Sequence, residues 1–393
     1  MCTVSNYASI TGVTMPQGFR AAGVTAGLKA SGKPDMAVVI NDGPLSSAAA
    51  VFTSNRCKAN PVLWSQEAMK SGSAKAVVIN SGGANCYTGP AGFAVTHATA
   101  EVAADRLGVG AIDIQIMSTG LIGLLNDKEA LLAGATAALE SASGDGGLAA
   151  AEAIMTTDTV AKVAFEDGDG WSVGGMAKGA GMLAPALATM LVVLTTDAVA
   201  DAATLDAALR MATAKTFDRL DSDGCQSTND TVLLMASGAS SVAPTVDELA
   251  EVLGRVCHSL ALQLLADAEG ADHEIAIEVI GAATESDALA VGRSVARSNL
   301  FKCAIYGKDP NWGRILASVG TTDAVFDPAN LDVSLNGVPV CVNSGPGEAV
   351  DAVSLEDRAV SVVIDLKSGD ATATIWTNDL THAYVHENSA YST

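Results

Sequence analysis

The residues with the clearest potential for chemistry lie in a glycine-rich stretch near the middle of the chain. Residues 175–191 read Gly-Met-Ala-Lys-Gly-Ala-Gly-Met-Leu-Ala-Pro-Ala-Leu-Ala-Thr-Met-Leu. A threonine hydroxyl is a weak nucleophile unless a base lies beside it. If the bond between Ala188 and Thr189 is cut, the new α-amine of Thr189, with a reference pKa of about 7.7–8.0, becomes such a base. The stretch therefore predicts acyl-transfer chemistry at an N-terminal threonine.

A structural interpretation of the same residues stays open. Threonine is β-branched and common in strands, so Thr189 can simply begin a buried strand that follows a glycine-rich turn. In the chemical interpretation, the small Ala188 lets Oγ of Thr189 reach the preceding carbonyl, and a strained turn favours an N-to-O acyl shift. The residues of this stretch alone do not separate the two.

Other familiar catalytic signatures are incomplete. Residues 27–34 nearly match a phosphate-binding loop, but Pro34 stands where a Mg²⁺-binding hydroxyl belongs, and no clear strand precedes the loop. His382 and His386 are four residues apart, but the residues between them are expected to be extended, which would hold the two rings too far apart to share a metal. No Gly-x-Ser-x-Gly motif occurs. We therefore predict no metal site and no Ser-His-Asp triad.

The glycine-rich stretch resembles the self-processing site of the ornithine acetyltransferase family. Further blocks resemble segments of that family, in the family's order: residues 80–85 (Asn-Ser-Gly-Gly-Ala-Asn), 118–123 (Ser-Thr-Gly-Leu-Ile-Gly), 153–158 (Ala-Ile-Met-Thr-Thr-Asp), 227–230 (Ser-Thr-Asn-Asp), 309–314 (Asp-Pro-Asn-Trp-Gly-Arg) and 387–393 (Glu-Asn-Ser-Ala-Tyr-Ser-Thr). The resemblance implies that Thr189 is the nucleophile, that the chain cleaves itself between Ala188 and Thr189, and that Thr119 and Gly120 form an oxyanion hole. It also implies a set of substrate contacts: Thr157, Lys178, Thr189, Glu269, Asn388 and Thr393.

The chemistry of these residues agrees with the implied roles. A strand that ends in Ser-Thr-Gly can present the hydroxyl of Thr119 and the N–H of Gly120 to one oxyanion, although the same residues also suit a plain strand-ending turn. Lys178 can neutralise a substrate carboxylate and Glu269 can pair with an amino group, as an amino-acid substrate requires. Without the resemblance, Glu269 would be interpreted as a solvated helix end and residues 388–393 as a fraying tail.

Two segments depart from the family pattern. Residues 271–274 read Ala-Asp-His-Glu where the family usually has a lysine, which predicts a more acidic charge near the substrate carboxylate. Cys225 and Gln226 replace smaller residues before Ser227, a packing change that also places an oxidisable thiol near the site.

Strands and helices alternate along the chain without a repeat of fixed length. Apolar runs bounded by turn residues predict strands at 36–40, 49–53, 76–80, 112–117, 161–165, 171–176, 190–194, 231–236, 274–280, 362–366 and 372–376. Helical spacing predicts helices at 92–107, 127–141, 149–155, 201–216, 247–268 and 287–297. The alternating polarity of residues 273–280 indicates a sheet with one half-exposed face. We therefore expect an α/β protein with layered sheets.

The resemblance implies a more specific fold and assembly. It implies a layered α/β/β/α sandwich of the ornithine acetyltransferase and DmpA aminopeptidase type, similar to the N-terminal-nucleophile hydrolases without matching their topology. After self-cleavage, residues 1–188 (α chain) and 189–393 (β chain) would remain one folded unit. Two α and two β chains would form a heterotetramer.

Composition limits the partners of the chain. Hydrophobic residues make up 49% and charged residues 17% of the 393 residues, which supports a large core. The formal charge of −22 repels phosphate backbones and anionic membranes, and no cluster of Lys or Arg offsets it, so we expect no nucleic-acid or membrane partner. Seven scattered cysteines without Cys-x-x-Cys spacing, together with no signal-peptide pattern and no apolar run of membrane-spanning length, predict a cytoplasmic enzyme.

The activity implied by the resemblance is acetyl transfer from N-acetylornithine to glutamate through an acetyl ester on Thr189, a step of arginine biosynthesis. It needs no cofactor or metal, and acetyl-CoA is a possible second donor. Two alternatives stay open. One is an aminopeptidase or amidase of the DmpA type, and the other is a non-catalytic amino-acid-binding protein that is never cleaved.

Overall fold

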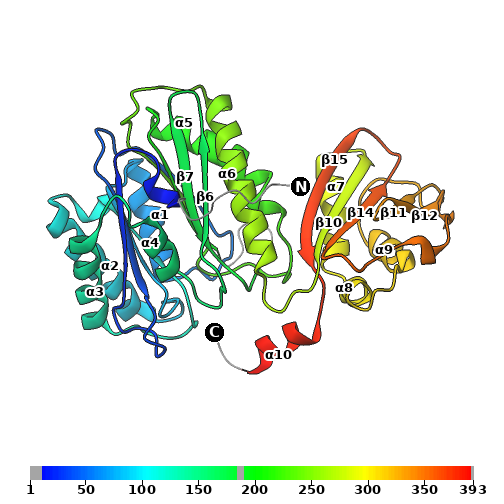
Figure 1. Cartoon of the computed structure of the whole chain (residues 1–393), viewed down its shortest axis with the longest axis horizontal. Helices are drawn as coiled ribbons and strands as arrows, with labels where there is room; N and C mark the ends of the chain where they lie inside the picture. The colour runs from blue at the N-terminus through cyan, green and yellow to red at the C-terminus, as the bar shows by residue number, and fades with distance from the viewer. Residues whose placement is uncertain (1–10, 184–189, 391–393) are drawn as a thin grey trace.

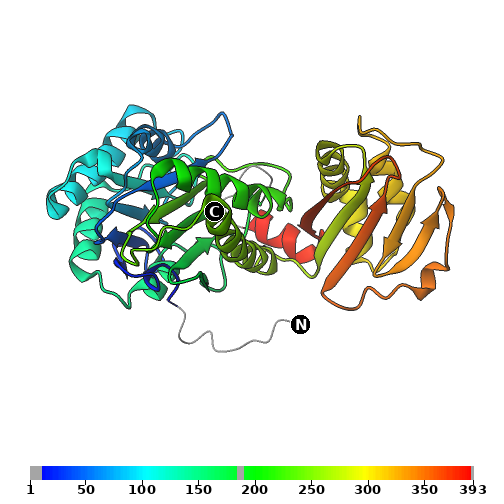
Figure 2. The ribbon, with the colours of Figure 1, turned by 90° about the horizontal axis from the view of Figure 1, so that it is seen from above.

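The structure, a computed structural model, describes residues 11–183 and 190–390. It has two lobes, seen side by side in Figures 1 and 2. The larger lobe contains the strands and helices up to residue 266, and the smaller lobe contains those from residue 274 to residue 378. A last helix, α10 (His382–Ala390), lies between the lobes in both views.

One sheet of the larger lobe has the strand order β1-β2-β4-β5. Its strands are β1 (Phe19–Val24), β2 (Met36–Asn41), β4 (Ala76–Asn80) and β5 (Ile114–Ser118). Strands β4 and β5 are parallel, and the other neighbours are antiparallel. The outer face packs against three helices: α1 (Asn60–Ala68), α2 (Gly89–Leu107) and α3 (Lys128–Ser141).

The second sheet of this lobe has the order β3-β9-β8-β7-β6. Its strands are β3 (Ala48–Phe52), β6 (Lys162–Asp167), β7 (Ser172–Lys178), β8 (Leu191–Thr196) and β9 (Thr231–Ala236). Only β8 and β9 are parallel within it. Its outer face packs against α5 (Ala202–Ala214) and α6 (Val246–Ala266).

Both faces of the central strands are apolar, and this explains the layers. In β2, Val38 packs toward the helices, whereas Val39 packs against the second sheet. In β8, Val193 faces the first sheet and Val192 faces α5 and α6. Strands buried on both faces appear in the sequence as continuous apolar runs. The predicted α/β/β/α sandwich is confirmed in the larger lobe, where α4 (Gly147–Ala153) also joins the core between the sheets.

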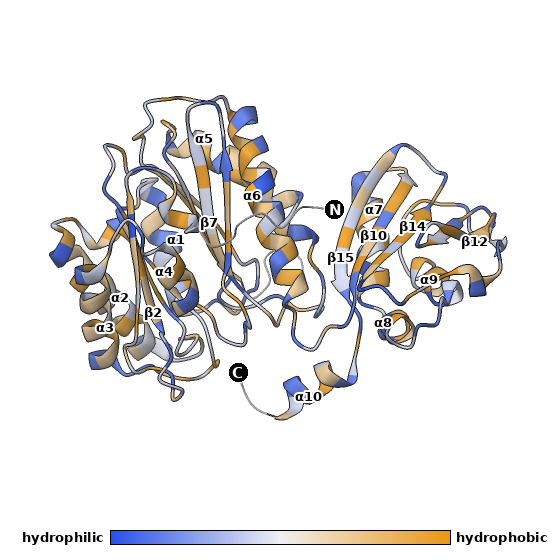
Figure 3. Ribbon diagram, in the orientation of Figure 1, coloured by the Kyte–Doolittle hydropathy of each residue, from blue (hydrophilic) through white to orange (hydrophobic). Residues whose placement is uncertain are grey.

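The smaller lobe is a single sheet with helices on one face. This lobe was not predicted from the sequence, because no shift in composition marks its boundary. Its strand order is β13-β12-β11-β14-β10-β15. The strands are β10 (Glu274–Ala282), β11 (Asp332–Leu335), β12 (Val338–Val342), β13 (Gly345–Pro346), β14 (Ala359–Asp365) and β15 (Ala371–Asn378). The helices are α7 (Glu285–Ala296), α8 (Asn299–Tyr306) and α9 (Trp312–Val319). The alternating burial of β10 confirms the half-exposed face predicted from its polarity, and Figure 3 shows how apolar residues concentrate on β10 and β14.

Helix α10 corrects one prediction. The residues between His382 and His386 are helical, not extended, so the two histidines sit one turn apart. The helix buries none of its side chains, which explains why no apolar periodicity marked it in the sequence. The ring of His382 instead packs edge-on against Tyr306, with 5.6 Å between the ring centres. Within residues 11–183 and 190–390, no three His, Cys, Asp or Glu side chains gather as metal ligands.

The loop that resembles a phosphate-binding motif also differs from the prediction. A strand, β1, does precede it, but the chain continues into strand β2 and not into the helix that a phosphate-binding loop requires. The carboxylate of Asp35 accepts the backbone N–H groups of Ala26 (2.6 Å), Leu28 (2.6 Å) and Lys29 (2.9 Å). The N–H groups that would hold a phosphate are therefore already occupied.

Helix α6 is the one helix in the described part of the chain that is long and apolar enough to cross a membrane. More than half of its apolar window, 56%, is buried inside the protein. Leu249, Leu253, Val256, Leu260 and Leu264 have no exposed surface and pack against the second sheet. Its hydrophobicity is therefore explained by its place in the core.

Candidate active site

Six of the predicted site residues meet in one small cavity. It has a volume of about 90 Å³ and lies where β5 and β7 end, beside the segment that follows α6. The residues that line it are Thr119, Gly120, Thr156, Thr157, Lys178, Gly181, Met182, Glu269 and Asn388. Among these, Thr156, Gly181 and Met182 were not predicted. The remaining predicted residues, Ala188, Thr189 and Thr393, lie outside the described residues.

The proposed oxyanion hole has the geometry of a constrained strand end. Thr119 is buried, and its N–H donates to the carbonyl of Asn80 at 2.9 Å. Gly120 has a φ of 120°, and a Cβ there would lie 3.0 Å from backbone atoms of Gly83, so only glycine fits. Among the described residues, the N–H of Gly120 donates to no acceptor. That the N–H of Gly120 receives an oxyanion stays a prediction, and an N–H without a partner in the described residues is compatible with it.

A buried amide network fixes this strand end. The side-chain amide of Asn229 donates to the carbonyls of Ala84 and Ser118, both at 2.7 Å. The amide of Asn80 donates to the hydroxyl of Ser118 at 2.5 Å, and the amide of Asn126 donates to the carbonyl of Gly83 at 3.1 Å. Blocks 80–85, 118–123 and 227–230, far apart in the sequence, therefore meet directly behind Thr119. Block 309–314, by contrast, lies at the start of α9 in the smaller lobe, away from the cavity.

Lys178 is the buried cation of the site. It ends β7, its side chain is 2% exposed, and its ammonium lies 3.5 Å from Oγ1 of Thr119 and 3.8 Å from the carboxylate of Asp158. Burial lowers the pKa of Lys178, and the negative charge of Asp158 opposes that change. Burial alone would raise the pKa of Asp158, but Lys178 and Lys162 together hold it below its usual range. The lysine and its carboxylate are therefore tightly coupled.

Glu269 supplies the opposite charge. It follows α6, and its N–H donates to the carbonyl of Ala180 at 2.9 Å, which docks the segment onto the end of β7. A Cβ at Gly181 would come within 2.7–2.8 Å of the Glu269 carboxylate, so the small residue is what admits that side chain. One cation and one anion thus line a single cavity, as a zwitterionic amino acid requires.

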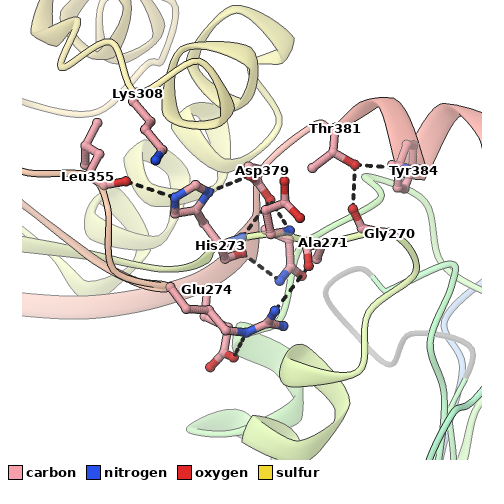
Figure 4. A network of polar contacts seen from close by, with 12 residues as sticks. Gly270, Ala271, His273, Glu274, Lys308, Leu355, Asp379, Thr381 and Tyr384 are labelled. Atoms are coloured by element: carbon pink, nitrogen blue, oxygen red, sulfur yellow. Dashed lines mark hydrogen bonds and ion pairs between the residues drawn. The ribbon is translucent and has the colours of Figure 1, made fainter.

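Helix α10 brings Asn388 to the cavity. The side-chain amide of Asn388 donates to the carbonyl of Tyr384 at 3.0 Å. The hydroxyl of Tyr384 in turn donates to Asp223 at 2.7 Å, and the other oxygen of Asp223 accepts the N–H of Leu183 at 2.6 Å. At the start of the helix, the hydroxyl of Thr381 donates to the carbonyl of Gly270, as Figure 4 shows. The helix is therefore anchored to segments on both sides of the site.

Asp230 is a buried acid that the sequence did not single out as functional. It has no exposed surface, and its Oδ1 accepts the N–H of Met190 at 3.0 Å, one residue after the predicted nucleophile. Within the described part of the chain, its Oδ2 has no hydrogen-bond partner. Burial raises the pKa of Asp230 well above its usual range. Its position in block 227–230 was the only signal that could have found it.

The two segments that depart from the family pattern do not line the cavity. His273 is buried, with Nδ1 2.7 Å from Asp379 and Nε2 3.2 Å from the carbonyl of Leu355 (Figure 4). Glu274 pairs with Arg358 at 2.6 Å. Neither His273 nor Glu274 lines the cavity. The thiol of Cys225 is exposed, and partial burial together with nearby carboxylates raises its pKa, which disfavours the reactive thiolate.

A model of the ArgJ family matches residues 20–393. The chain is 61% identical over 380 residues to the arginine biosynthesis bifunctional protein ArgJ of Streptomyces coelicolor, covering 97% of this chain and 99% of the relative. It is also 61% identical to the ArgJ protein of Thermobifida fusca (97% and 100% covered) and 55% identical to that of Mycobacterium tuberculosis (97% and 96%).

Two solved structures are also similar. One is ornithine acetyltransferase complexed with ornithine from Mycobacterium tuberculosis, with 53% identity, a TM-score of 0.44, and coverage of 46% of this chain and 96% of that chain. The other is the arginine biosynthesis bifunctional protein of Bacillus halodurans, with 35% identity, a TM-score of 0.48, and coverage of 50% and 97%. The family match over nearly the whole length and the identity to full-length relatives show that this chain belongs to the ArgJ family of arginine-biosynthesis enzymes.

Proposed function

We propose that this chain transfers an acetyl group from N-acetylornithine to glutamate through an acetyl ester on Thr189. The observation that carries the proposal is the cavity in which Thr119, Gly120, Lys178 and Glu269 converge. Membership in the ArgJ family and the names of its relatives support the same reaction. The cavity combines a donor for an oxyanion with one cationic and one anionic side chain, which suits an acylated amino acid.

The chemical steps follow from these groups. The α-amine of Thr189 takes the hydroxyl proton while Oγ attacks the acetyl carbonyl of N-acetylornithine. The hydroxyl of Thr119 and the N–H of Gly120 donate to the oxygen that becomes negative. The amine of ornithine leaves with a proton, the amine of glutamate attacks the ester, and Thr189 is released. Lys178 pairs with the substrate carboxylate and Glu269 with an amino group.

The nucleophile arises by self-cleavage between Ala188 and Thr189. The segments on either side of this bond share one sheet, which supports a stable unit after cleavage. Strand β7 pairs with β8 in a six-residue antiparallel register, and β3 pairs with β9. The α chain 1–188 and the β chain 189–393 would therefore stay together, with the β chain contributing to both lobes.

The wider setting is also part of the proposal. The reaction requires no cofactor or metal, and acetyl-CoA is a second acetyl donor. The enzyme works in the cytoplasm as a heterotetramer of two α and two β chains, without nucleic-acid or membrane partners. Its formal charge of −22 supports the exclusion of these anionic partners.

Initial-rate kinetics test the reaction. A covalent acetyl-enzyme predicts parallel double-reciprocal lines when N-acetylornithine and glutamate are varied together. Intersecting lines would contradict the ester intermediate. Acetate release without glutamate would favour the DmpA-type amidase. A single uncleaved chain on denaturing electrophoresis, with amino-acid binding but no turnover, would favour the binding protein.

A further inference from the structure

A buried network of alternating charges runs from the end of α6 to the oxyanion hole. The ammonium of Lys162, which has no exposed surface, lies 2.7 Å from Asp158 and 2.6 Å from Asp267. Asp158 in turn lies 3.8 Å from the ammonium of Lys178, which contacts Thr119. Asp267 is two residues before Glu269, so the network joins the segment that carries Glu269 to the strand end that carries Lys178.

Asp158 is held rigidly at the centre of this network. Its Oδ1 accepts the N–H of Gly179 at 2.6 Å as well as the contact from Lys162, and its Oδ2 accepts the N–H of Thr156 at 2.9 Å. Gly179 directly follows Lys178, and Thr156 lines the cavity. One carboxylate therefore ties the loop that carries Thr157 to the strand end that carries Lys178.

We propose that Asp158 is a positioning residue of this active site, which keeps the Lys178 ammonium charged and directs it at the hydroxyl of Thr119. The inference rests on the acetyl-transfer function proposed above. An ammonium that donates to Oγ1 of Thr119 leaves the hydroxyl proton free to point at the developing oxyanion. The present 3.5 Å contact is long, and such contacts tighten when substrate binds.

Charge balance explains why Lys178 needs this partner. Burial disfavours its ammonium, and Lys162 repels it, whereas Asp158, Glu269 and Asp230 favour it. Lys29, in the loop between β1 and β2, is a further cation, and it and Lys178 repel each other. Burial lowers the pKa of Lys29 to about 8. Of the three carboxylates, Asp158 has the largest effect on Lys178. Removing its charge should therefore lower the pKa of Lys178 further.

Substitution of Asp158 tests the proposal by pH dependence. Lys178 is charged below its pKa, so activity that needs the ammonium falls as the pH rises through that value. Asp158→Asn should move this alkaline limb of kcat/KM to lower pH and reduce kcat at neutral pH on the order of tenfold. In a Lys178→Arg background the guanidinium stays charged, so Asp158→Asn should no longer move the limb. An alkaline limb that stays at the wild-type pH in Asp158→Asn would overturn the proposal.

A matched control separates positioning from plain structural support. Asp197 is also buried and accepts the N–H groups of Ser172 (2.7 Å) and Gln17 (3.1 Å), at the opposite end of β7 from Lys178. It pairs with no lysine or arginine in the described residues. Asp197→Asn should lower stability without moving the alkaline limb of kcat/KM. Asp158→Glu keeps the charge, so its alkaline limb should lie closer to the wild-type pH than that of Asp158→Asn.

A titration that needs no activity completes the test. The titration uses NMR on uncleaved Thr189→Ala protein in which the lysines are labelled with ¹³C at Cε. The signal of Lys178 is assigned as the one that disappears when Lys178→Arg is added, and its chemical shift reports the charge of Lys178. We expect a charged Lys178 at neutral pH, a lower midpoint after Asp158→Asn and no change after Asp197→Asn. A neutral Lys178 at neutral pH in this otherwise unaltered protein would overturn the proposal even if Asp158→Asn does not fold. If Lys178 titrates as expected but the wild-type enzyme transfers no acetyl group, the result would contradict only the proposed function.

Discussion

Lys178 and Glu269 give the cavity one cationic and one anionic side chain, and Thr119 lies beside the cation. Glycines beside these residues leave the space that they occupy. Gly181 leaves room for the Glu269 carboxylate, and Gly120 lets the strand end approach Gly83. The chemistry of the site therefore depends as much on where side chains are absent as on where they are present.

The proposed oxyanion hole predicts a specific kinetic effect for Thr119→Ala. The substitution removes one of the two proposed donors, while the N–H of Gly120 remains. Losing one such donor lowers kcat by about 10²–10³, or about 2.7–4 kcal/mol of transition-state stabilisation. The affinity for N-acetylornithine should change much less, because the oxygen carries full charge only in the transition state.

Steady-state kinetics on Thr119→Ala enzyme that is confirmed as two fragments measures this effect. Serine is the informative control, because Thr119→Ser keeps the hydroxyl and should retain most of kcat. Wild-type kcat in correctly cleaved Thr119→Ala enzyme would show that Thr119 is only a strand-ending residue.

At the scale of elements, helix α10 contributes a residue to the cavity although its composition shows no apolar face. It buries no side chain, yet it carries Asn388 to the cavity and is held by the hydroxyl of Tyr384 on Asp223. Asp223 also binds the N–H of Leu183, the last described residue before the predicted cleavage site. The helix is therefore positioned by polar contacts at a few points and not by an apolar face.

Tyr384→Phe tests this anchoring. Removing the hydroxyl eliminates one hydrogen bond of roughly 1 kcal/mol, so KM for N-acetylornithine should rise about fivefold with little change in kcat. Tyr87→Phe is a suitable control, because Tyr87 is 71% exposed and lies outside the cavity. Equal KM values for Tyr384→Phe and wild type would show that Asn388 reaches the substrate without this tether.

Periodicity predicted most of the larger lobe because its strands are continuous apolar runs. It missed β1, whose Phe-Arg-Ala-Ala-Gly-Val sequence has little β-propensity and becomes a strand by pairing with β2. It also missed α8 and α9, which have eight residues each; their starts are marked only by the capping side chains of Ser298 and Asn311.

The predicted site residues converged, but the network behind them was not predictable from spacing. Lys162 pairs with Asp158 four residues away and also with Asp267, more than a hundred residues away. Such long-range pairs depend on how the sheets and α6 pack together, and no local pattern records them. Asp158 and Asp230 lie in blocks that resemble the family, but their contacts, like those of Asp223, emerge only from the fold.

On the scale of the whole molecule, the cavity takes residues from the segment that connects the lobes and from the helix that follows the smaller lobe. Glu269 belongs to the segment from α6 to β10, and Asn388 follows the segment that leaves β15. His273 and Asp379 join the segments that enter and leave the smaller lobe by a 2.7 Å contact, which Figure 4 shows. The lobes are further linked by Arg297 on Asp221 at 2.8 Å, where burial raises the pKa of Asp221 to about 6. The relative position of the lobes thus helps to shape the site.

The nucleophile itself is the central claim, and intact-mass spectrometry with donor alone tests it most directly. The enzyme should separate under denaturing conditions into residues 1–188 and 189–393. After incubation with N-acetylornithine and no glutamate, the fragment that begins at Thr189 should gain the mass of one acetyl group, and added glutamate should remove it. Thr189→Ala should give one intact, unlabelled and inactive chain, because it lacks both the attacking hydroxyl and the later nucleophile. Two fragments from Thr189→Ala, or acetyl transfer by wild-type enzyme with no label on the Thr189 fragment, would contradict the account.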